Sequence, residues 1–153
     1  MSSNLPIRIR PAIQEDVPFI FNSWLKSFRH SHIGRLVTNE IYFNSQHKII
    51  EKILQENTVM VACNQEDPSQ LYGYIVAGDV EGHFILHYVY IKHTYRNMGL
   101  AKTLLNTFSH DPSTASVYTH HTRVAEKLAS KYNFVFHPYL LFNMKESNNE
   151  QSE

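Results

Sequence analysis

The sequence contains very little cysteine and no long apolar run. Cys63 is the single cysteine among 153 residues, so a disulfide within the chain is excluded. No apolar stretch reaches the length of about 20 residues that a membrane-spanning helix needs. The first residues, MSSNLPIRIRP, lack the apolar segment of a signal peptide. We therefore expect a reduced, cytoplasmic location.

An excess of charge of one sign is also missing. The chain has 14 basic and 14 acidic residues, which argues against a strong general nucleic-acid binder and leaves a local basic patch open. Ten histidines are many for this length. However, no pair on a predicted helix has the i,i+4 spacing of a zinc site, and no cysteine pair accompanies them. We expect no metal site.

One stretch, from His83 to Ser109, is the part of the sequence that most favours a binding site. Phe84–Ile91 is almost entirely apolar, β-branched or aromatic, which predicts a strand buried on both faces. After a turn over Tyr95–Ala101, four apolar residues share one face of a predicted helix: Leu100, Leu104, Leu105 and Phe108. Backbone N–H groups at a helix N-terminus, directly after a central strand, can bind an anion such as a pyrophosphate.

The rest of the chain alternates between predicted strands and helices. Strands are expected at Ile7–Pro11, Val59–Cys63, Leu71–Ala77, Ala115–His120, Phe134–Phe136 and Tyr139–Met144, the last two as a hairpin. Helices are expected from Val17 to Phe28 after Asp16 as N-cap, from about Asn44 to Glu56, and from Arg123 to Tyr132. Gly78–Gly82 should form a turn. We predict one α+β domain over residues 1–144 and a disordered polar tail over residues 145–153.

The turn after the central strand carries a family motif. Arg96-Asn97-Met98-Gly99-Leu100-Ala101 resembles the acetyl-CoA-binding motif of the GCN5-related N-acetyltransferases (GNAT): Arg or Gln, two residues, Gly, one residue, then Gly or Ala. Val89, Ile91 and Tyr95 also fit the lead-in of that motif. RPAIQEDVPFI is similar to the opening strand and first helix of the family, and FNSWLKSFRHSH is similar to a segment of phage- or prophage-encoded relatives.

The resemblance implies a fold and a co-substrate. The fold is a mixed, mostly antiparallel sheet of six to seven strands, flanked by four helices and splayed between strands four and five. The co-substrate is acetyl-CoA, with its pantetheine paired along Val89, Tyr90 and Ile91. Its pyrophosphate would meet the backbone amides of Asn97, Met98, Gly99, Leu100 and Ala101, and the side chains of Arg96 and Lys102. Gly99 would let the backbone approach the phosphates without a Cβ.

The catalytic groups are less well defined by the resemblance. The family often places a carboxylate on the fourth strand, where this chain offers His87 beside Tyr88 and Tyr90; His87 is either the base or a buried core residue. A backbone N–H of Val89 or Tyr90 would hold the thioester oxygen.

The acid that the family often uses, a tyrosine after the fifth strand, is also replaced. The helix that would carry it has Ala129 at the tyrosine position, with Tyr132 three residues later. Other candidates for the acid are Tyr118, His120, His121 and Ser130. Three alternatives remain: another residue serves, the thiolate leaves unassisted, or the protein does not acetylate.

The acceptor side is expected to draw on Trp24, Phe28 and Arg29, with the 30–38 loop and the 78–83 hairpin. The predicted acceptor side has no acidic cluster, which would have favoured a polyamine or a basic peptide as substrate. The predicted function is an acetyl-CoA-dependent N-acetyltransferase acting on an amine of a small molecule or peptide. The alternatives are a nucleic-acid base-modifying enzyme of the same fold and a non-catalytic acyl-CoA-binding module. Because family members often dimerise, a homodimer is a further expectation.

Overall fold

A single mixed sheet organises the structure. The computed structural model describes residues 5–29, 39–108, 116–120, 122–131 and 134–137. In these residues the sheet has six strands in sequential order. They are β1 (Ile7–Pro11), β2 (Thr58–Asn64), β3 (Leu71–Val80), β4 (His83–Ile91), β5 (Ser116–Tyr118) and β6 (Phe134–Phe136). Neighbours are antiparallel from β1 to β4 and parallel from β4 to β6, which confirms the predicted α+β class.

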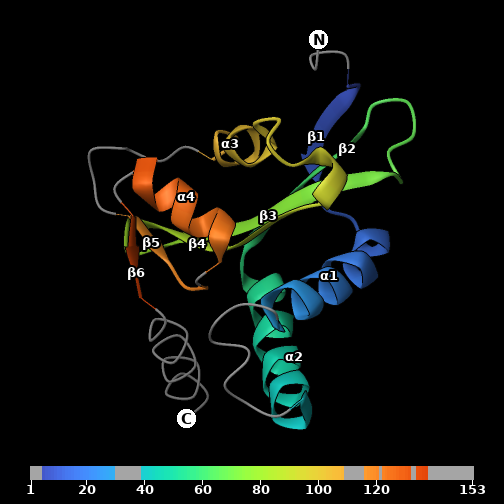
Figure 1. Ribbon diagram of the computed structural model, residues 1–153. Helices are drawn as coiled ribbons and strands as arrows, with labels where there is room; N and C mark the ends of the chain where they lie inside the picture. Colours follow the sequence, from blue (N-terminus) through green and yellow to red (C-terminus); the bar gives the residue numbers. More distant parts are fainter. Residues whose placement is uncertain (1–4, 30–38, 109–115, 121, 132–133, 138–153) are drawn as a thin grey trace.

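Within the described residues, four α-helices cover the two faces of this sheet (Figure 1). They are α1 (Val17–Arg29), α2 (Asn39–Glu56), α3 (Leu100–Leu105) and α4 (Arg123–Lys131). In Figure 1, α3 and α4 lie above the sheet, and α1 and α2 lie below it. Short 3-10 helices, Gln14–Asp16 and His93–Tyr95, precede α1 and the turn before α3. None of the described helices combines the length and apolar character that a membrane crossing requires.

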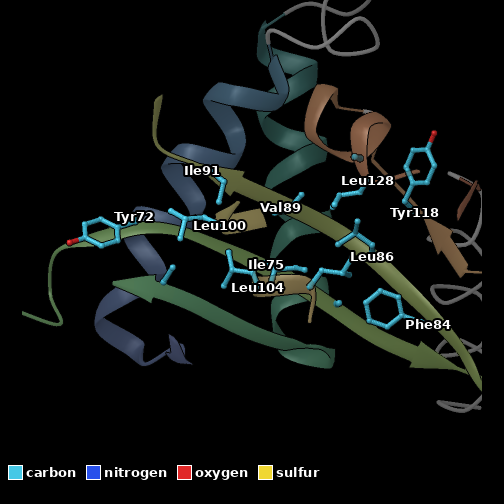
Figure 2. Packing of buried hydrophobic residues seen from close by; sticks show 14 residues of the cluster. Tyr72, Ile75, Phe84, Leu86, Val89, Ile91, Leu100, Leu104, Tyr118 and Leu128 are labelled. Carbon is cyan, nitrogen blue, oxygen red and sulfur yellow. The ribbon is translucent and has the colours of Figure 1, made fainter. Parts of the chain in front are cut away.

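Each face of the sheet has its own hydrophobic cluster, as a sheet covered by helices on both faces requires. The cluster under α3 and α4 includes Ile75, Leu86, Val89, Leu104 and Leu128 (Figure 2). The cluster against α1 and α2 includes Trp24, Phe28, Ile50, Tyr74 and Tyr88. The central strands β3 and β4 contribute to both clusters, so their near-continuous apolar sequences are explained by burial on both sides.

The strand β4 contains a β-bulge at His87. Its register with β3 passes from Tyr88 opposite Val76 to Leu86 opposite Ala77, so His87 is the extra residue of β4. Because a bulge adds one residue, it reverses which positions face each layer. Leu86 and Val89 therefore face the same cluster although they are three residues apart.

The strands β4 and β5 separate soon after they meet. Their pairing covers Ile85 and Leu86 of β4, with a further bond from the Thr119 N–H to the Leu86 carbonyl at 3.1 Å. The rest of β4 continues to Ile91 and is paired with β3 alone within the described residues. This gap is the predicted splay between the fourth and fifth strands.

Three predicted boundaries were wrong. Gly78, Asp79 and Val80 continue β3 opposite β4 rather than forming a turn. The turn is only Glu81-Gly82, both at positive φ, 53° and 83°, because a two-residue hairpin turn requires that conformation. The helix α2 begins at Asn39 instead of near Asn44, and β5 ends at Tyr118, before His120. The predicted strand Tyr139–Met144 lies outside the described residues.

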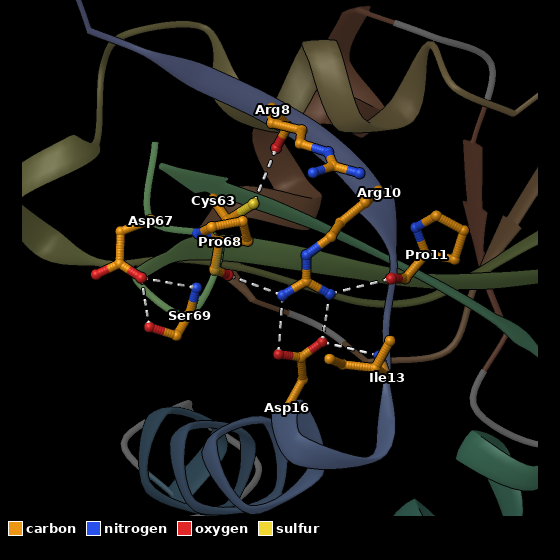
Figure 3. Close-up of polar contacts among 9 residues, drawn as sticks. All are labelled: Arg8, Arg10, Pro11, Ile13, Asp16, Cys63, Asp67, Pro68 and Ser69. Atoms are coloured by element: carbon orange, nitrogen blue, oxygen red, sulfur yellow. Dashed lines mark hydrogen bonds and ion pairs between the residues drawn. The ribbon is translucent and has the colours of Figure 1, made fainter. Parts of the chain in front are cut away.

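Asp16 precedes α1 as expected, but its carboxylate binds Arg10 instead of capping the helix (Figure 3). Two bonds, of 2.7 Å and 3.1 Å, join the guanidinium to the carboxylate, and the Ile13 N–H donates to it at 2.8 Å. Arg10 also donates to the Pro68 carbonyl at 2.9 Å. Burial alone would raise the pKa of Asp16, but the bonds from Arg10 and Ile13 hold that pKa below its usual value.

Replacing Asp16 by asparagine is expected to lower the free energy of unfolding by about 3 kcal/mol, because a buried guanidinium loses its counter-charge. Chemical denaturation measures this loss. Since the pKa of Asp16 is depressed, its contribution is present above the ordinary carboxyl pKa and disappears as pH falls through the lower folded value. The matched control is Asp67→Asn, at an exposed loop position. An Asp16→Asn variant as stable as that control would show that the pair contributes nothing.

Candidate active site

The outer edge of β4 presents backbone groups that no strand in the described part of the chain pairs. The Lys92 N–H donates to the Tyr72 carbonyl at 2.8 Å. In an antiparallel ladder the direction alternates, so Tyr90 and Tyr88 also bond to β3 and the Val89 and Ile91 peptide groups point away from it. The Ile91 carbonyl accepts the Arg96 Nε at 2.9 Å on that side. Of the two amides predicted to hold the thioester oxygen, this register favours Val89.

The turn after β4 has the backbone conformation of an anion site. Asn97 and Gly99 both have positive φ, 65° and 78°. A Cβ added to Gly99 would meet nothing within 4 Å, so it would extend into open space. The buried Leu100 side chain anchors α3 to the core, and the first amides of a helix have no carbonyl partner within it.

The charge around this turn is positive. No acidic residue occurs between Glu81 and Asp111, while Lys92, Arg96 and Lys102 do. Arg96 and Lys102 are exposed. An anion at the turn would therefore meet unpaired amides and cationic side chains, and no carboxylate from this segment would oppose it. The residues present fit the pyrophosphate of a CoA molecule.

An open cleft of about 470 Å³ lies between α1 and the end of β4. Its lining comprises Phe19, Asn22, Ser23, Lys26, Ser27, Tyr90 and Arg96. Two of its hydroxyls are engaged with the sheet: Ser23 with Tyr74 at 2.9 Å, and Ser27 with Tyr88 at 2.5 Å. Among the described residues that line the cleft, Lys26 and Arg96 are cationic and none is a carboxylate, so their charges disfavour a polycation.

The bulge residue His87 belongs to a buried polar chain. Its Nδ1 lies 3.0 Å from the Thr119 Oγ1, and that oxygen lies 3.0 Å from the Nδ1 of His120. His87 is 1% exposed and His120 is 3% exposed. Burial lowers the pKa of His87 to about 4. Burial, and then the charge of His87, lowers the pKa of His120 to about 3, so both rings are neutral at pH 7.

Aromatic rings enclose His120. Trp24, Phe28 and Tyr88 lie at centroid distances of 5.3, 4.8 and 5.8 Å from its ring, each close to perpendicular. Trp24 also stacks on Tyr88 at 4.5 Å. Two polar atoms of this cluster, Trp24 Nε1 and His87 Nε2, are buried without a hydrogen-bond partner among the described residues. Such atoms call for a water or a reacting group.

Comparisons with known proteins identify the fold. No protein-family model matches the chain, and no curated protein matches its sequence. A structure from Pyrococcus furiosus, described as a candidate acetyl transferase, shares 15% identity over 92% of this chain and 91% of that one, with a TM-score of 0.52. A structure described as histone acetyltransferase HPA2 and related acetyltransferase, from Corynebacterium glutamicum, shares 17% sequence identity over 67% of this chain and 69% of that one. Its TM-score is also 0.52. The chain has the fold of the GCN5-related N-acetyltransferases.

The sequences within this GNAT fold are distant. The PaiA N-acetyltransferase from Thermoplasma acidophilum, solved in complex with coenzyme A, shares 20% identity over 82% of this chain and 72% of that one, with a TM-score of 0.48. For two further acetyltransferase structures, the match spans 62% and 54% of the other chain, less than two thirds of each.

The GNAT fold places most of the predicted cofactor residues along one edge, from β4 into the turn before α3. The predicted acceptor residues lie elsewhere: Trp24 and Phe28 are buried against His120, and Arg29 lies over the Tyr42 ring at 5.2 Å. Tyr132, His121 and the 30–38 loop lie outside the described residues. No group of three potential metal ligands occurs in the part of the chain that the structure describes.

Sequence reasoning missed Thr119 and gave His120 only a minor place. No local pattern distinguishes Thr119, since its role depends on β4 and β5 lying side by side. A signal for His120 did exist: it is the last residue of the predicted strand Ala115–His120, which is the neighbour of β4 in the resembling family.

Proposed function

We propose that the protein is a GNAT-family acyltransferase that moves an acetyl group from acetyl-CoA directly to an amine. The observation that carries this proposal is the continuous edge formed by the outward peptides of Val89 and Ile91 and the turn at Gly99. That edge offers backbone partners to an extended amide chain and amides with cationic side chains to its phosphates. The GNAT fold supports the same assignment.

The proposed placement of the cofactor follows this edge. The pantetheine would pair along Val89 to Ile91, and the pyrophosphate would lie at the amides from Asn97 to Ala101, with Lys102 nearby. The Ile91 carbonyl already accepts Arg96, so a bound pantetheine pairs with the Val89 peptide or displaces that bond. When bound, acetyl-CoA supplies the acetyl thioester.

In this proposal, residues of the chain accept the proton of the amine and stabilise the negative charge that develops on the thioester oxygen. An alkyl amine with a pKa near about 10 is mostly protonated at neutral pH and must lose a proton to attack. His87 is proposed as the acceptor, because its Nε2 is buried and unpartnered among the described residues and its ring is neutral at pH 7. The Val89 N–H would stabilise the oxygen on which negative charge develops.

Protonation of the departing thiolate is assigned to a tyrosine. Tyr90 lines the cleft beside Arg96, and the alternative is Tyr132, three residues after the position at which the family often has its tyrosine. Because Ala129 occupies the family's usual tyrosine position, Tyr90→Phe is the first variant to make. Acceptor-dependent release of CoA that persists unchanged in both Tyr90→Phe and Tyr132→Phe would show that the thiolate leaves unassisted.

A calorimetric titration with acetyl-CoA and with free CoA tests the proposal. We expect saturable binding with a Kd in the micromolar range, followed by acceptor-dependent CoA release in an amine panel. If neither ligand binds, the Arg96–Ala101 motif is only a turn between β4 and α3, and the proposal is refuted.

Binding without release would support a second candidate, a non-catalytic acyl-CoA-binding module. The specific observations that favour it are Ala129 in the tyrosine position and the lack of a carboxylate on β4. The amine panel separates the two, and it should include anionic, neutral and polycationic amines, since Lys26 and Arg96 line the cleft.

A further inference from the structure

Two histidine rings share one hydroxyl group at the point where β4 and β5 separate. The Thr119 Oγ1 lies 3.0 Å from the Nδ1 of His87 and 3.0 Å from the Nδ1 of His120. All three residues are buried. Burial alone lowers the pKa of His87, and among the described residues the only charge that acts on the His120 ring is that of His87. The hydrogen bonds among His87, Thr119 and His120 therefore depend on which ring nitrogens carry a hydrogen.

Counting hydrogens restricts the tautomers. A threonine hydroxyl donates one hydrogen and accepts through oxygen, and a neutral imidazole carries one N–H. For both 3.0 Å bonds to be made, Thr119 donates to one Nδ1 and accepts from the other. One ring must then have its hydrogen on Nδ1, and the other ring must have it on Nε2.

The unpartnered Nε2 of His87 distinguishes the two possibilities. If His87 carried its hydrogen on Nε2, a buried N–H donor would have no acceptor. If it carries the hydrogen on Nδ1, a lone pair is left without a donor, and native proteins tolerate this more often than an orphaned N–H. In addition, a hydrogen bond with the His87 backbone raises the pKa of His120, as a carbonyl that accepts from the ring would.

We propose that Thr119 and His120 are positioning residues that hold His87 with its hydrogen on Nδ1 and a lone pair on Nε2. This inference rests on the proposed function, in which that lone pair accepts a proton. Once neutral, the amine nitrogen would bond to the acyl carbon and give a proton to Nε2 of His87, while the C–S bond of the thioester breaks and CoA leaves as the thiolate. The ring becomes an imidazolium, with its Nδ1–H still donating to Thr119. Buried carboxylates orient catalytic histidines in the same way, and here a neutral Thr–His pair replaces the carboxylate.

The aromatic rings around His120 hold that ring in its orientation. Trp24, Phe28 and Tyr88 contact the ring at centroid distances of 4.8 to 5.8 Å, at angles of 67° to 87°. Edge-to-face contacts of this kind have a preferred geometry and resist rotation of the ring. They keep the Nδ1 of His120 directed at Thr119. Trp24 and Phe28, predicted to contact the acceptor, are thereby assigned to hold His120.

Nitrogen-15 NMR of histidine-labelled protein at pH 7 tests the hydrogen positions directly, because ring nitrogens with and without hydrogen have well-separated shifts. His87→Gln and His120→Phe assign the two signals. We expect His87 as the Nδ1–H tautomer and His120 as the Nε2–H tautomer. Thr119→Val, which removes the hydroxyl and keeps the shape, should release His87 into a tautomer mixture, and Thr119→Ser should restore the wild-type pattern.

The same variants are then compared in acyl transfer with an amine found in the panel. Thr119→Val is expected to lower kcat by about 10- to 100-fold, a part of what general base catalysis contributes, with KM for acetyl-CoA unchanged. Thr119→Ser should stay within about threefold of wild type, since the hydroxyl is retained. If Thr119→Val fails to fold, His120→Phe replaces it as the test variant. Without the His120 ring, the Thr119 hydroxyl can donate to Nδ1 of His87, so His87 is no longer held with its hydrogen on Nδ1.

The outcomes separate this inference from the proposed function. A wild-type His87 with its hydrogen on Nε2, or a Thr119→Val variant with unchanged tautomers or unchanged kcat, overturns the positioning role. An inactive wild type with the expected tautomers refutes the acyltransferase proposal and leaves the hydrogen-bond arrangement standing.

Discussion

Replacing Gly99 by alanine is expected to weaken acetyl-CoA binding by at least about 100-fold, the equivalent of two lost charge-assisted hydrogen bonds. Gly99 has a φ of 78° and its missing Cβ would meet nothing within 4 Å. The protein itself has room for the methyl group. The space that the methyl would enter is the space proposed for the pyrophosphate, so the phosphates are pushed away from the amides of α3.

The backbone strain of this substitution must be separated from its effect on the ligand. An alanine at positive φ costs about 1 kcal/mol or slightly more in any left-handed position. Gly82 provides the matched control, because its φ is 83° and its Cβ would also meet nothing within 4 Å. Gly82 lies in the β3–β4 turn, at the other end of the nine-residue strand β4, about 26 Å away at the usual rise per residue.

Both variants should therefore lose similar stability in thermal denaturation, and only Gly99→Ala should lose affinity in calorimetric titration. Two results would contradict the placement of the cofactor. One is a folded Gly99→Ala variant that binds acetyl-CoA as wild type does. The other is an equal loss of affinity in Gly82→Ala, which would indicate a general effect of strain.

The part of the fold nearest to this glycine was predictable from sequence because its signals are local. An apolar strand, a turn with Gly99 and an apolar helical stripe follow one another within 26 residues of the same segment, Phe84–Ser109. Each signal depends on neighbours in the chain: burial on both faces for the strand, positive φ for the glycine, and a period of 3.6 for the helix. The structure has the strand, turn and helix in that order.

The arrangement around His87 was not predictable in the same way, because a bulge depends on pairing between strands. Simple alternation along β4 would put Leu86 and Val89 on opposite faces, but both lie in the cluster under α3 and α4. The extra residue at His87 causes this reversal. It also explains why His87 reaches across to Thr119, a contact between residues 32 positions apart. No spacing within the sequence indicates that contact.

Arg10 illustrates the same limit for charge. Alternation over Ile7–Pro11 correctly puts Arg8 and Arg10 on one face of β1, yet Arg10 is buried and Arg8 is exposed. The difference comes from Asp16 and the Pro68 carbonyl, which close over the guanidinium from outside the strand (Figure 3). A sequence pattern assigns the face of a strand, and only the packing of distant segments decides whether that face is covered.

Acidification from about pH 6.5 to pH 4 is expected to destabilise the protein by several kcal/mol, because two buried histidines must take up protons. Burial lowers the pKa of His87 to about 4 and that of His120 to about 3, from 6.5. Between these values and 6.5 the unfolded chain binds more protons than the folded one, so stability falls as pH falls. Above pH 6.5 both states hold neutral rings and the effect vanishes.

The variant His120→Phe should remove much of this dependence. Phenylalanine keeps a ring among Trp24, Phe28 and Tyr88, and it cannot be protonated. At pH 7 the variant should be slightly less stable than wild type, since the Thr119 hydroxyl loses one partner. As pH falls toward 4 the difference should shrink and then reverse, because only wild type still has to protonate two rings.

Urea denaturation at half-unit pH intervals measures this crossing, and His93→Gln is the control for losing an exposed histidine. The control should follow the wild-type curve at every pH, because the His93 side chain is already exposed to solvent in the folded protein. Parallel curves for His120→Phe and wild type would mean that His120 reaches solvent in the folded protein. The ring could not then be held among Trp24, Phe28 and Tyr88, and Thr119 would be free to reorient. The acid sensitivity and the lone pair on His87 therefore have the same cause, the enclosure of His120.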